Sequence, residues 1–283
     1  MGSARNIEPD RVPITVASMP SPPAVLLGQN RARRAAIVDE LRRRLPRMES
    51  AAAATRALPF GLATLDAHLP QGGLTVGALH EIAPQTPADT PAAFGFLAAL
   101  LARFVPPSRP LLLVATSRAF ADHGRPHGHG LSRLGFDPAR LILVETRAEK
   151  QALWAMEEAL RSAVPAAVAG MIARLDLKSS QRLHLAAGAA GLPLVLLRPA
   201  QAGEASAAAT RWRVGAAEAA RDRFGLITRA GWKVTLERCR NGRPGEWLVE
   251  FDHAAYRFSL AAPLADPALS RHPGQRLFGR RGG

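Results

Sequence analysis

The sequence predicts an α/β protein whose central sheet is mainly parallel, is flanked by helices and ends in an antiparallel hairpin. Five short apolar runs between residues 78 and 198 alternate with Ala-rich segments of helical spacing, a pattern typical of parallel strands that are buried on both faces. After residue 208 the helical segments stop, and two apolar runs flank the turn sequence "RNGRPG". With 283 residues, of which 47% are hydrophobic and 21% charged, the chain can bury a large core.

The predicted strands and helices alternate in the order that βαβ units require. The strands are expected at 78–83, 110–116, 140–145, 166–173 and 193–198. The helices are expected at 92–104, 149–162 and 179–190. Alternation then groups three apolar side chains on one face of each hairpin strand: Trp232, Val234 and Leu236, followed by Trp247, Val249 and Phe251. We expect these faces to be the buried side of a sheet; stacking on nucleic-acid bases is the alternative.

Three regions are predicted along the chain. Residues 1–56 form a flexible N-terminal arm, in which an apolar residue recurs every four positions from Ile37 among many arginines and indicates a basic amphipathic helix. This helix is expected to pack on its own domain, to hold a neighbouring subunit or to touch DNA. Residues 57–262 form the core domain, and 263–283 form a basic tail that is predicted to be disordered.

The charge of the chain favours anionic partners. The sequence has 37 Lys and Arg against 23 Asp and Glu, a formal charge of +14, which attracts nucleic acid or an acidic protein. Cys239 is the single cysteine, so an internal disulfide and a cysteine-rich metal site are excluded. Neighbouring arginines are expected to lower the pKa of Cys239, although its place on a strand favours a structural role. The sequence has no signal-peptide pattern and no apolar run of membrane-spanning length, so we expect a cytoplasmic protein.

Several segments in the right order resemble one bacterial family. Residues 58–82, "LPFGLATLDAHLPQGGLTVGALHEI", resemble the beginning of the RecA core. From about residue 57 to 260 the chain resembles the ImuA family, and the resemblance is carried further by residues 131–162, 179–199, 206–214 and 242–251. It implies a RecA-like core and an accessory role in error-prone translesion DNA synthesis during SOS mutagenesis. The implied partners are ImuB, a polymerase-like adaptor, and through it a DnaE-type polymerase and the sliding clamp, with DNA as a further partner and a nucleoid-associated location during DNA damage.

A phosphate loop is missing where the RecA-like frame would place one. The motif G-x-x-x-x-G-K-[ST] supplies backbone N–H groups, a cationic lysine and a magnesium-binding hydroxyl. When the motif is laid on the chain after "EI", its glycines fall on Pro84 and Asp89, its lysine on Thr90 and its last residue on Pro91. Thr90 and Pro91 are instead predicted as the N-cap and first residue of the following helix.

The other two catalytic positions also lack their residues. A RecA-type ATPase carries a glutamate beyond its second core strand, whereas here Thr116, Ser117 and Arg118 follow that strand and the first acid is Asp122. The strand that should end in a magnesium-orienting carboxylate has none before Asp176, which is expected to begin the next helix. The sequence therefore predicts no ATP hydrolysis, no catalytic residue and no cofactor.

Two further groups of residues are candidate chemical sites. His123, His127 and His129 lie close enough in sequence to ligate zinc or nickel, but no further ligand completes a fixed set, so we expect a mobile surface loop without metal. Ser179 and Ser180 have no identifiable paired base and are expected to cap a helix rather than act as nucleophiles.

Arginines near the end of the core are candidate contacts to DNA or to a protein partner. In "SAAATRWRV", Arg211 and Arg213 with Trp212 form a phosphate-and-stacking group, while the same alternation is equally typical of a half-buried strand with a basic outer face. The hairpin turn adds three candidates that a solvated edge also explains: Arg238, Arg240 and Arg243. Residues 274–279, "GQRLFG", are similar to sliding-clamp peptides but one residue short.

The functional hypothesis that follows is a non-catalytic, RecA-like accessory protein of translesion synthesis that binds ImuB and helps assemble the mutagenic complex. One alternative is a DNA-stimulated ATPase of the RecA/RadA type with degenerate motifs. Another is a SulA-like inhibitor that binds a tubulin-like division protein. The sequence leaves open the oligomeric state and whether the chain binds DNA directly.

Overall fold

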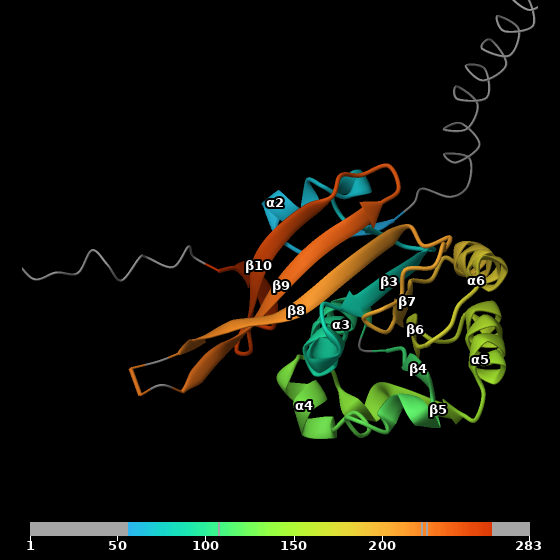
Figure 1. Cartoon of the computed structure of the whole chain (residues 1–283), viewed down its shortest axis with the longest axis horizontal. Coiled ribbons are helices and arrows are strands. Elements are labelled where there is room, and N and C mark those ends of the chain that lie inside the picture. Colours follow the sequence, from blue (N-terminus) through green and yellow to red (C-terminus); the bar gives the residue numbers. More distant parts are fainter. Residues whose placement is uncertain (1–55, 107, 222, 225, 262–283) are drawn as a thin grey trace, which may run out of the picture. The chain divides into compact units, whose positions relative to one another are not determined.

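The structure is a computed structural model that describes residues 56–106, 108–221, 223–224 and 226–261 (Figure 1). The predicted N-terminal helix and the "GQRLFG" peptide both lie outside these residues. Within the described residues, no helix is long and apolar enough to cross a membrane.

A nine-stranded sheet organises the described residues in the order β11-β10-β9-β8-β3-β7-β6-β4-β5. The parallel part consists of β3 (Leu79–Pro84), β4 (Leu111–Thr116), β5 (Leu141–Thr146), β6 (Ala167–Met171), β7 (Leu194–Leu197) and β8 (Thr210–Arg221). The antiparallel part adds β9 (Ile227–Cys239), β10 (Gly245–Asp252) and β11 (Arg257–Leu260). A separate pair is formed by β1 (Ala57–Leu58) and β2 (Leu74–Thr75). The predicted fold class is confirmed.

Helices cover both faces of the parallel part (Figure 1). The long helices are α3 (Thr90–Phe104), α5 (Glu149–Ser162) and α6 (Leu177–Ala190), and the short ones are α2 (Ala63–Asp66) and α4 (Gly128–Arg133). Buried residues of α3 pack in one apolar cluster with β8 and β9, whereas α5 and α6 pack in a second cluster with β4, β6 and β7. Gly191 ends α6 in a left-handed conformation with φ 62°, which glycine adopts without steric cost.

Aromatic side chains dominate the cluster beneath α3. Phe60 lies 5.4 Å from Trp212 and Phe96 lies 5.7 Å from Trp232, measured between ring centroids. Trp232 and Phe251 are buried, as are Val234, Leu236 and Val249 on the same face, and Trp247 is half-buried against the same cluster. The predicted buried side of the hairpin is therefore confirmed, and these rings hold the antiparallel strands against the core.

The hairpin strand β8 is longer than the sequence suggested. The sequence indicates a half-buried strand only within "SAAATRWRV", yet β8 continues through the Ala-rich residues 216–220 to Arg221. Alanine is a poor strand former, but pairing with β9 along this stretch, as in Ala217↔Gly231, outweighs that preference.

Candidate functional site

The turn between β3 and α3 occupies the position of a phosphate loop and is closed by Asp89. The backbone N–H of Thr86 donates to Asp89 Oδ2 at 3.0 Å, and the Thr86 hydroxyl donates to the same oxygen at 2.6 Å. The second oxygen, Oδ1, accepts from the backbone N–H of Ala216 on β8 at 2.9 Å. These bonds, led by the one from Ala216, hold the pKa of Asp89 below its usual value. The Asp89 carboxylate thus accepts hydrogen bonds from donor groups that could otherwise bind an anionic ligand at this turn.

The cap of α3 differs from the prediction. Thr90 does not cap the helix; its hydroxyl donates to the Pro87 carbonyl at 2.7 Å. A 3-10 turn, Pro87–Asp89, runs directly into α3, which begins at Thr90. The backbone N–H groups that lack a helical partner therefore belong to this turn, and the Thr86–Asp89 capping box caps them. The prediction of Thr90 as N-cap was wrong, although the chain does close this helix end with its own side chains.

A carboxylate at the start of α5, not one that follows β6, binds the loop at the end of β6. Glu149, the first residue of α5, accepts from the backbone N–H of Ala173 at 2.9 Å and of Arg174 at 3.0 Å through its Oε1 atom. Sequence reasoning considered only residues that directly follow β6 and therefore missed Glu149. This carboxylate oxygen binds two backbone donors of the loop after β6.

The next helix begins as predicted at Asp176. Its Oδ1 atom accepts from the backbone N–H of Ser179 at 2.7 Å, which makes Asp176 the N-cap of α6. The expectation that the serines cap a helix was wrong, because both lie inside its first turn. Ser179 donates to Asp176, and the buried Ser180 hydroxyl donates to Leu177 and accepts from Ala207.

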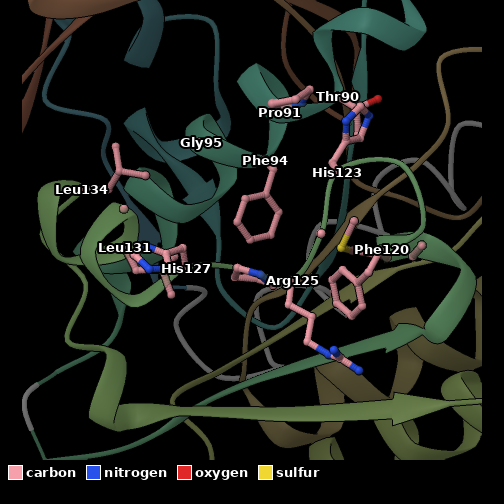
Figure 2. A pocket seen from close by; sticks show the side chains of 15 residues that line it. Thr90, Pro91, Phe94, Gly95, Phe120, His123, Arg125, His127, Leu131 and Leu134 are labelled. Carbon is pink, nitrogen blue, oxygen red and sulfur yellow. The ribbon is translucent and has the colours of Figure 1, made fainter.

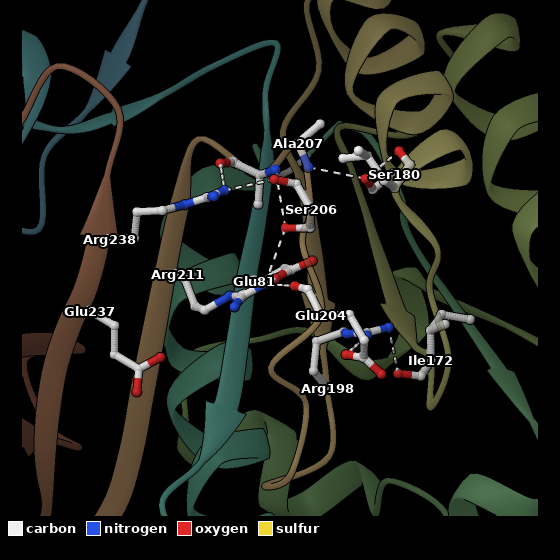
Figure 3. Close-up of polar contacts among 12 residues, drawn as sticks. Glu81, Ile172, Ser180, Arg198, Glu204, Ser206, Ala207, Arg211, Glu237 and Arg238 are labelled. Atoms are coloured by element: carbon white, nitrogen blue, oxygen red, sulfur yellow. Dashed lines mark hydrogen bonds and ion pairs between the residues drawn. The ribbon is translucent and has the colours of Figure 1, made fainter. Parts of the chain in front are cut away.

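A cavity of about 690 Å³ lies at the carboxyl edge of the parallel strands. Arg118, Arg147 and Arg174 follow β4, β5 and β6, which are neighbours in the sheet, and all three line this cavity. Arg198, which follows β7, also lines it but is buried and donates to Ile172 at 3.3 Å and to Glu204 at 3.1 Å (Figure 3). The carboxyl edge of a parallel sheet is where α/β proteins usually bind ligands.

A second, apolar cavity of about 330 Å³ adjoins the first (Figure 2). Both cavities are lined by Thr90, Ala119, His123 and Met171. The apolar part of the second cavity comes from α3, α4 and the turn after β4, through Phe94, Phe120, Leu131 and Leu134. An arginine-lined space and an apolar recess therefore meet at one edge of the sheet.

The three candidate histidines do not form a metal site. Among the residues that the structure describes, no group of three or more His, Cys, Asp or Glu side chains is placed to hold a metal ion. The rings of His127 and His129 lie 5.4 Å apart, and His123 lines both cavities. The loop prediction was wrong for residues 128–130, which begin α4 because the buried Leu131 anchors this helix to the core.

The candidate contact residues on β8 make contacts inside the molecule, as Figure 3 shows for Arg211. Arg211 forms an ion pair with the buried Glu81 at 3.0 Å, and Arg213 forms one with Glu237 at 2.9 Å. Trp212 is only 1% exposed and donates its indole N–H to Thr210. The structure places this segment as a half-buried strand, in which the Trp212 ring is not available to stack on a base.

The arginines near the hairpin turn are more exposed than those on β8. Arg238 donates to the carbonyl groups of Ser206 and Ala208 at 2.9 and 2.7 Å, while Arg240 and Arg243 lie exposed at the turn. Contact of these arginines with DNA or a partner stays a prediction. Burial raises the pKa of the Cys239 thiol, so the expected lowering was wrong; the Arg238 guanidinium is bound to backbone carbonyls instead.

Sequence reasoning missed a buried polar network around His80. With its proton on Nε2, His80 donates to the Thr75 carbonyl at 2.9 Å, and its Nδ1 accepts from the Thr210 hydroxyl at 2.8 Å. Thr210 in turn accepts the indole N–H of Trp212. Burial lowers the pKa of His80 to about 4, so the ring is neutral near pH 7. A histidine inside the apolar run "ALHEIA" was the available signal.

The fold and the site define a class of protein: a parallel-sheet α/β protein with an antiparallel extension, whose turn at the phosphate-loop position is closed by its own carboxylate. A scan against models of known protein families finds no match. The chain is 35% identical over 241 residues to the curated proteins called Protein ImuA from two strains of Caulobacter vibrioides, which covers 80% of this chain and 97% of each relative. The chain therefore belongs to the ImuA family, and the resemblance noted in the sequence is confirmed.

Proposed function

We propose that this chain is a non-catalytic accessory protein of error-prone translesion DNA synthesis, which binds ImuB and helps assemble the mutagenic polymerase complex. The observation that carries the non-catalytic part is the position of Asp89. Its carboxylate accepts three hydrogen bonds at the turn where a nucleotide-binding relative would offer donors to phosphate. An incoming phosphate would meet a negative charge and a turn already bound to the chain.

The surroundings of the turn support the same conclusion. Thr90 stands where the motif requires a lysine, so no ammonium group neutralises a terminal phosphate there. Beyond β4, where a RecA-type ATPase carries its glutamate, this chain has Arg118. Beside the end of β6, one oxygen of Glu149 accepts hydrogen bonds from two backbone N–H groups. A carboxylate engaged in this way is less available to orient magnesium and its waters.

Family membership supports the assembly role, and the basic charge is compatible with it. ImuB is the proposed direct partner, and through it the chain would reach a DnaE-type polymerase and the sliding clamp. Direct contact with DNA and a nucleoid-associated location during DNA damage are further parts of the proposal. A formal charge of +14 favours encounter with either an acidic protein surface or DNA.

The test is to mix the full chain with ImuB of the same organism at physiological salt and measure the molar mass of the product by light scattering. We expect a stoichiometric complex. Serum albumin, an acidic protein, is the control for unspecific attraction to a basic chain. Absence of association with ImuB at micromolar concentration would overturn the partner assignment.

A further inference from the structure

We propose that the arginine-lined cavity and the apolar cavity together form a docking site for an acidic peptide segment that carries an apolar anchor side chain. The proposal deepens the assembly role and rests on it, because it assigns to a protein partner the edge of the sheet that a nucleotide would otherwise take. The observation behind it is the meeting of the two cavities at Thr90, Ala119, His123 and Met171.

Arg118, Arg147 and Arg174 are exposed, line the larger cavity and make no ion pair with any residue that the structure describes. Each follows a different strand of the neighbouring set β6-β4-β5, so the fold itself brings them to one place. Three guanidinium groups around one space favour carboxylate or phosphate groups in a ligand.

Asp122 and Glu149 are the acidic residues that line the larger cavity, and Glu149 is held against backbone N–H groups of Ala173 and Arg174. Arg125 of the apolar cavity is bound to Glu145. Positive charge is therefore in excess at the shared rim, and an acidic ligand complements it.

The lining of the second cavity favours a peptide over a nucleotide. Its apolar part consists of Phe94, Phe120, Leu131, Leu134 and Met171, while its polar side chains are Thr90, His123, His127 and Arg125, the last of which is bound to Glu145 (Figure 2). A nucleobase placed against the apolar part would leave the donors and acceptors that face it without partners, at a cost in free energy. An aliphatic or aromatic side chain needs no such partner, so a peptide with acidic residues on either side of an apolar residue fits both cavities.

The experiment uses a random peptide library displayed on phage, selected against the immobilised full chain. We expect the selected peptides to be enriched in Asp and Glu around Leu, Ile, Phe or Trp. A labelled copy of the leading peptide is then titrated by fluorescence anisotropy. The triple variant R118E/R147E/R174E should weaken binding by more than about tenfold, because it reverses the charge at the whole rim.

Two further variants make the test specific. Ala119→Phe fills the junction of the cavities with a single change and should weaken binding without altering net charge. The matched control K178E/R223E/R257E changes the net charge by the same amount at exposed residues that line neither cavity, and it should bind within about twofold of the wild type. Thermal unfolding of each variant verifies that it is folded.

Peptides without acidic residues, or equal weakening by the control, would overturn the docking site. So would a single-stranded oligonucleotide or ATP that binds in an Arg118-, Arg147- and Arg174-dependent manner while no acidic peptide is enriched. The library contains no ImuB, so the two tests are independent. If acidic peptides are selected but no complex with ImuB forms, the assignment of ImuB as partner is rejected and the docking site is retained. Formation of the ImuB complex without acidic selection rejects the docking site alone.

Discussion

The arginines of β8 and β9 and those at the carboxyl edge of the parallel strands differ in what surrounds them. On the antiparallel side, Arg211, Arg213 and Arg229 are paired with Glu81, Glu237 and Glu250. At the carboxyl edge, Arg118, Arg147 and Arg174 have no ion-pair partner within the described part of the chain. The first group therefore joins strands of the sheet, whereas the second is exposed and has no ion pair within the described residues.

The physical reason lies in the position of each group along its strand. Residues within β8 and β9 have strands on both sides, so cross-strand carboxylates lie within reach, as Glu237 does for Arg213 at 2.9 Å. Residues that follow a parallel strand lie in a loop, where no neighbouring strand holds a carboxylate in register. Arg198, after β7, is buried and paired with Glu204, whereas Arg118, Arg147 and Arg174 are exposed to solvent.

The largest effect that would test this comparison is expected at Trp212. If this side chain is structural, Trp212→Ala should lower the free energy of unfolding by about 3–5 kcal/mol, because it removes a buried aromatic ring from the core. Urea unfolding measures the loss, and Trp212→Phe should cost less. A small loss of stability together with loss of DNA binding would instead support the stacking interpretation.

A somewhat smaller effect is expected when the buried ion pair is broken. Glu81 is 2% exposed, and Arg211→Ala leaves its carboxylate without a cation, which should cost about 3 kcal/mol of unfolding free energy. The double variant E81L/R211M should recover much of this loss in the same urea titration. Arg240→Ala, at an exposed site, is the control and should change stability by less than about 0.5 kcal/mol. Equal losses for Arg211 and Arg240 would contradict the structural role of the pair.

His80 predicts how stability depends on pH. Its folded-state pKa is about 4, below the usual 6.5, so between these pH values His80 is protonated in the unfolded chain and neutral in the folded chain. The stabilising contribution of neutral His80 is complete above pH 6.5 and is lost as the pH falls toward 4. By pH 5 the loss is about 2 kcal/mol of unfolding free energy. Urea titrations across this range measure the slope, and His80→Gln should flatten it. An unchanged slope in that variant would show that other groups are responsible.

Asp89 should make a smaller contribution. Asp89→Asn keeps the shape of the side chain but weakens the bonds from Thr86 and Ala216, and it should cost about 1 kcal/mol near neutral pH. Because the folded pKa of Asp89 is lowered, its contribution is present above the unfolded pKa and disappears as the pH falls through the folded value. The difference between wild type and variant should therefore shrink in acid. A difference that grows in acid would contradict the assigned hydrogen bonds.

The smallest effect on stability is expected at the carboxyl edge. Alanine at Arg118, Arg147 or Arg174 should change the free energy of unfolding by less than about 0.5 kcal/mol each, because no internal partner is lost. Selected acidic peptides should nevertheless bind these variants more weakly in fluorescence anisotropy. A large loss of stability at these positions would remove the distinction between the two groups of arginines.

Periodicity and turn chemistry predicted most of the described elements. The apolar run 110–116 became β4, and the alternation from Trp232 to Leu236 became the buried face of β9. These patterns are local, because the spacing of the apolar residues within one helix or strand predicts which of its faces is buried. The N-cap of α6 was predicted for the same reason, because Asp176 bonds to a residue three positions away.

The polar details of the site could not be predicted, because they join distant parts of the chain. Asp89 bonds to Ala216, which lies 127 residues later, and Glu149 bonds to Ala173, which lies 24 residues later. Likewise, the ion pair between Glu81 and Arg211 exists only because β3 and β8 lie side by side. One sequence cannot show which charges meet in this way, so all its arginines looked equally available.

We propose that the carboxyl edge of this sheet does not bind nucleotide and receives a protein partner instead. Titration of the full chain with ATP and magnesium by isothermal calorimetry tests it most directly, with phosphate release measured in the presence of DNA. Because Asp89 closes the turn, we predict no saturable heat and no DNA-stimulated phosphate release. Saturable binding of ATP at micromolar concentration, or phosphate release that DNA stimulates, would contradict the account and support a RecA/RadA-type ATPase.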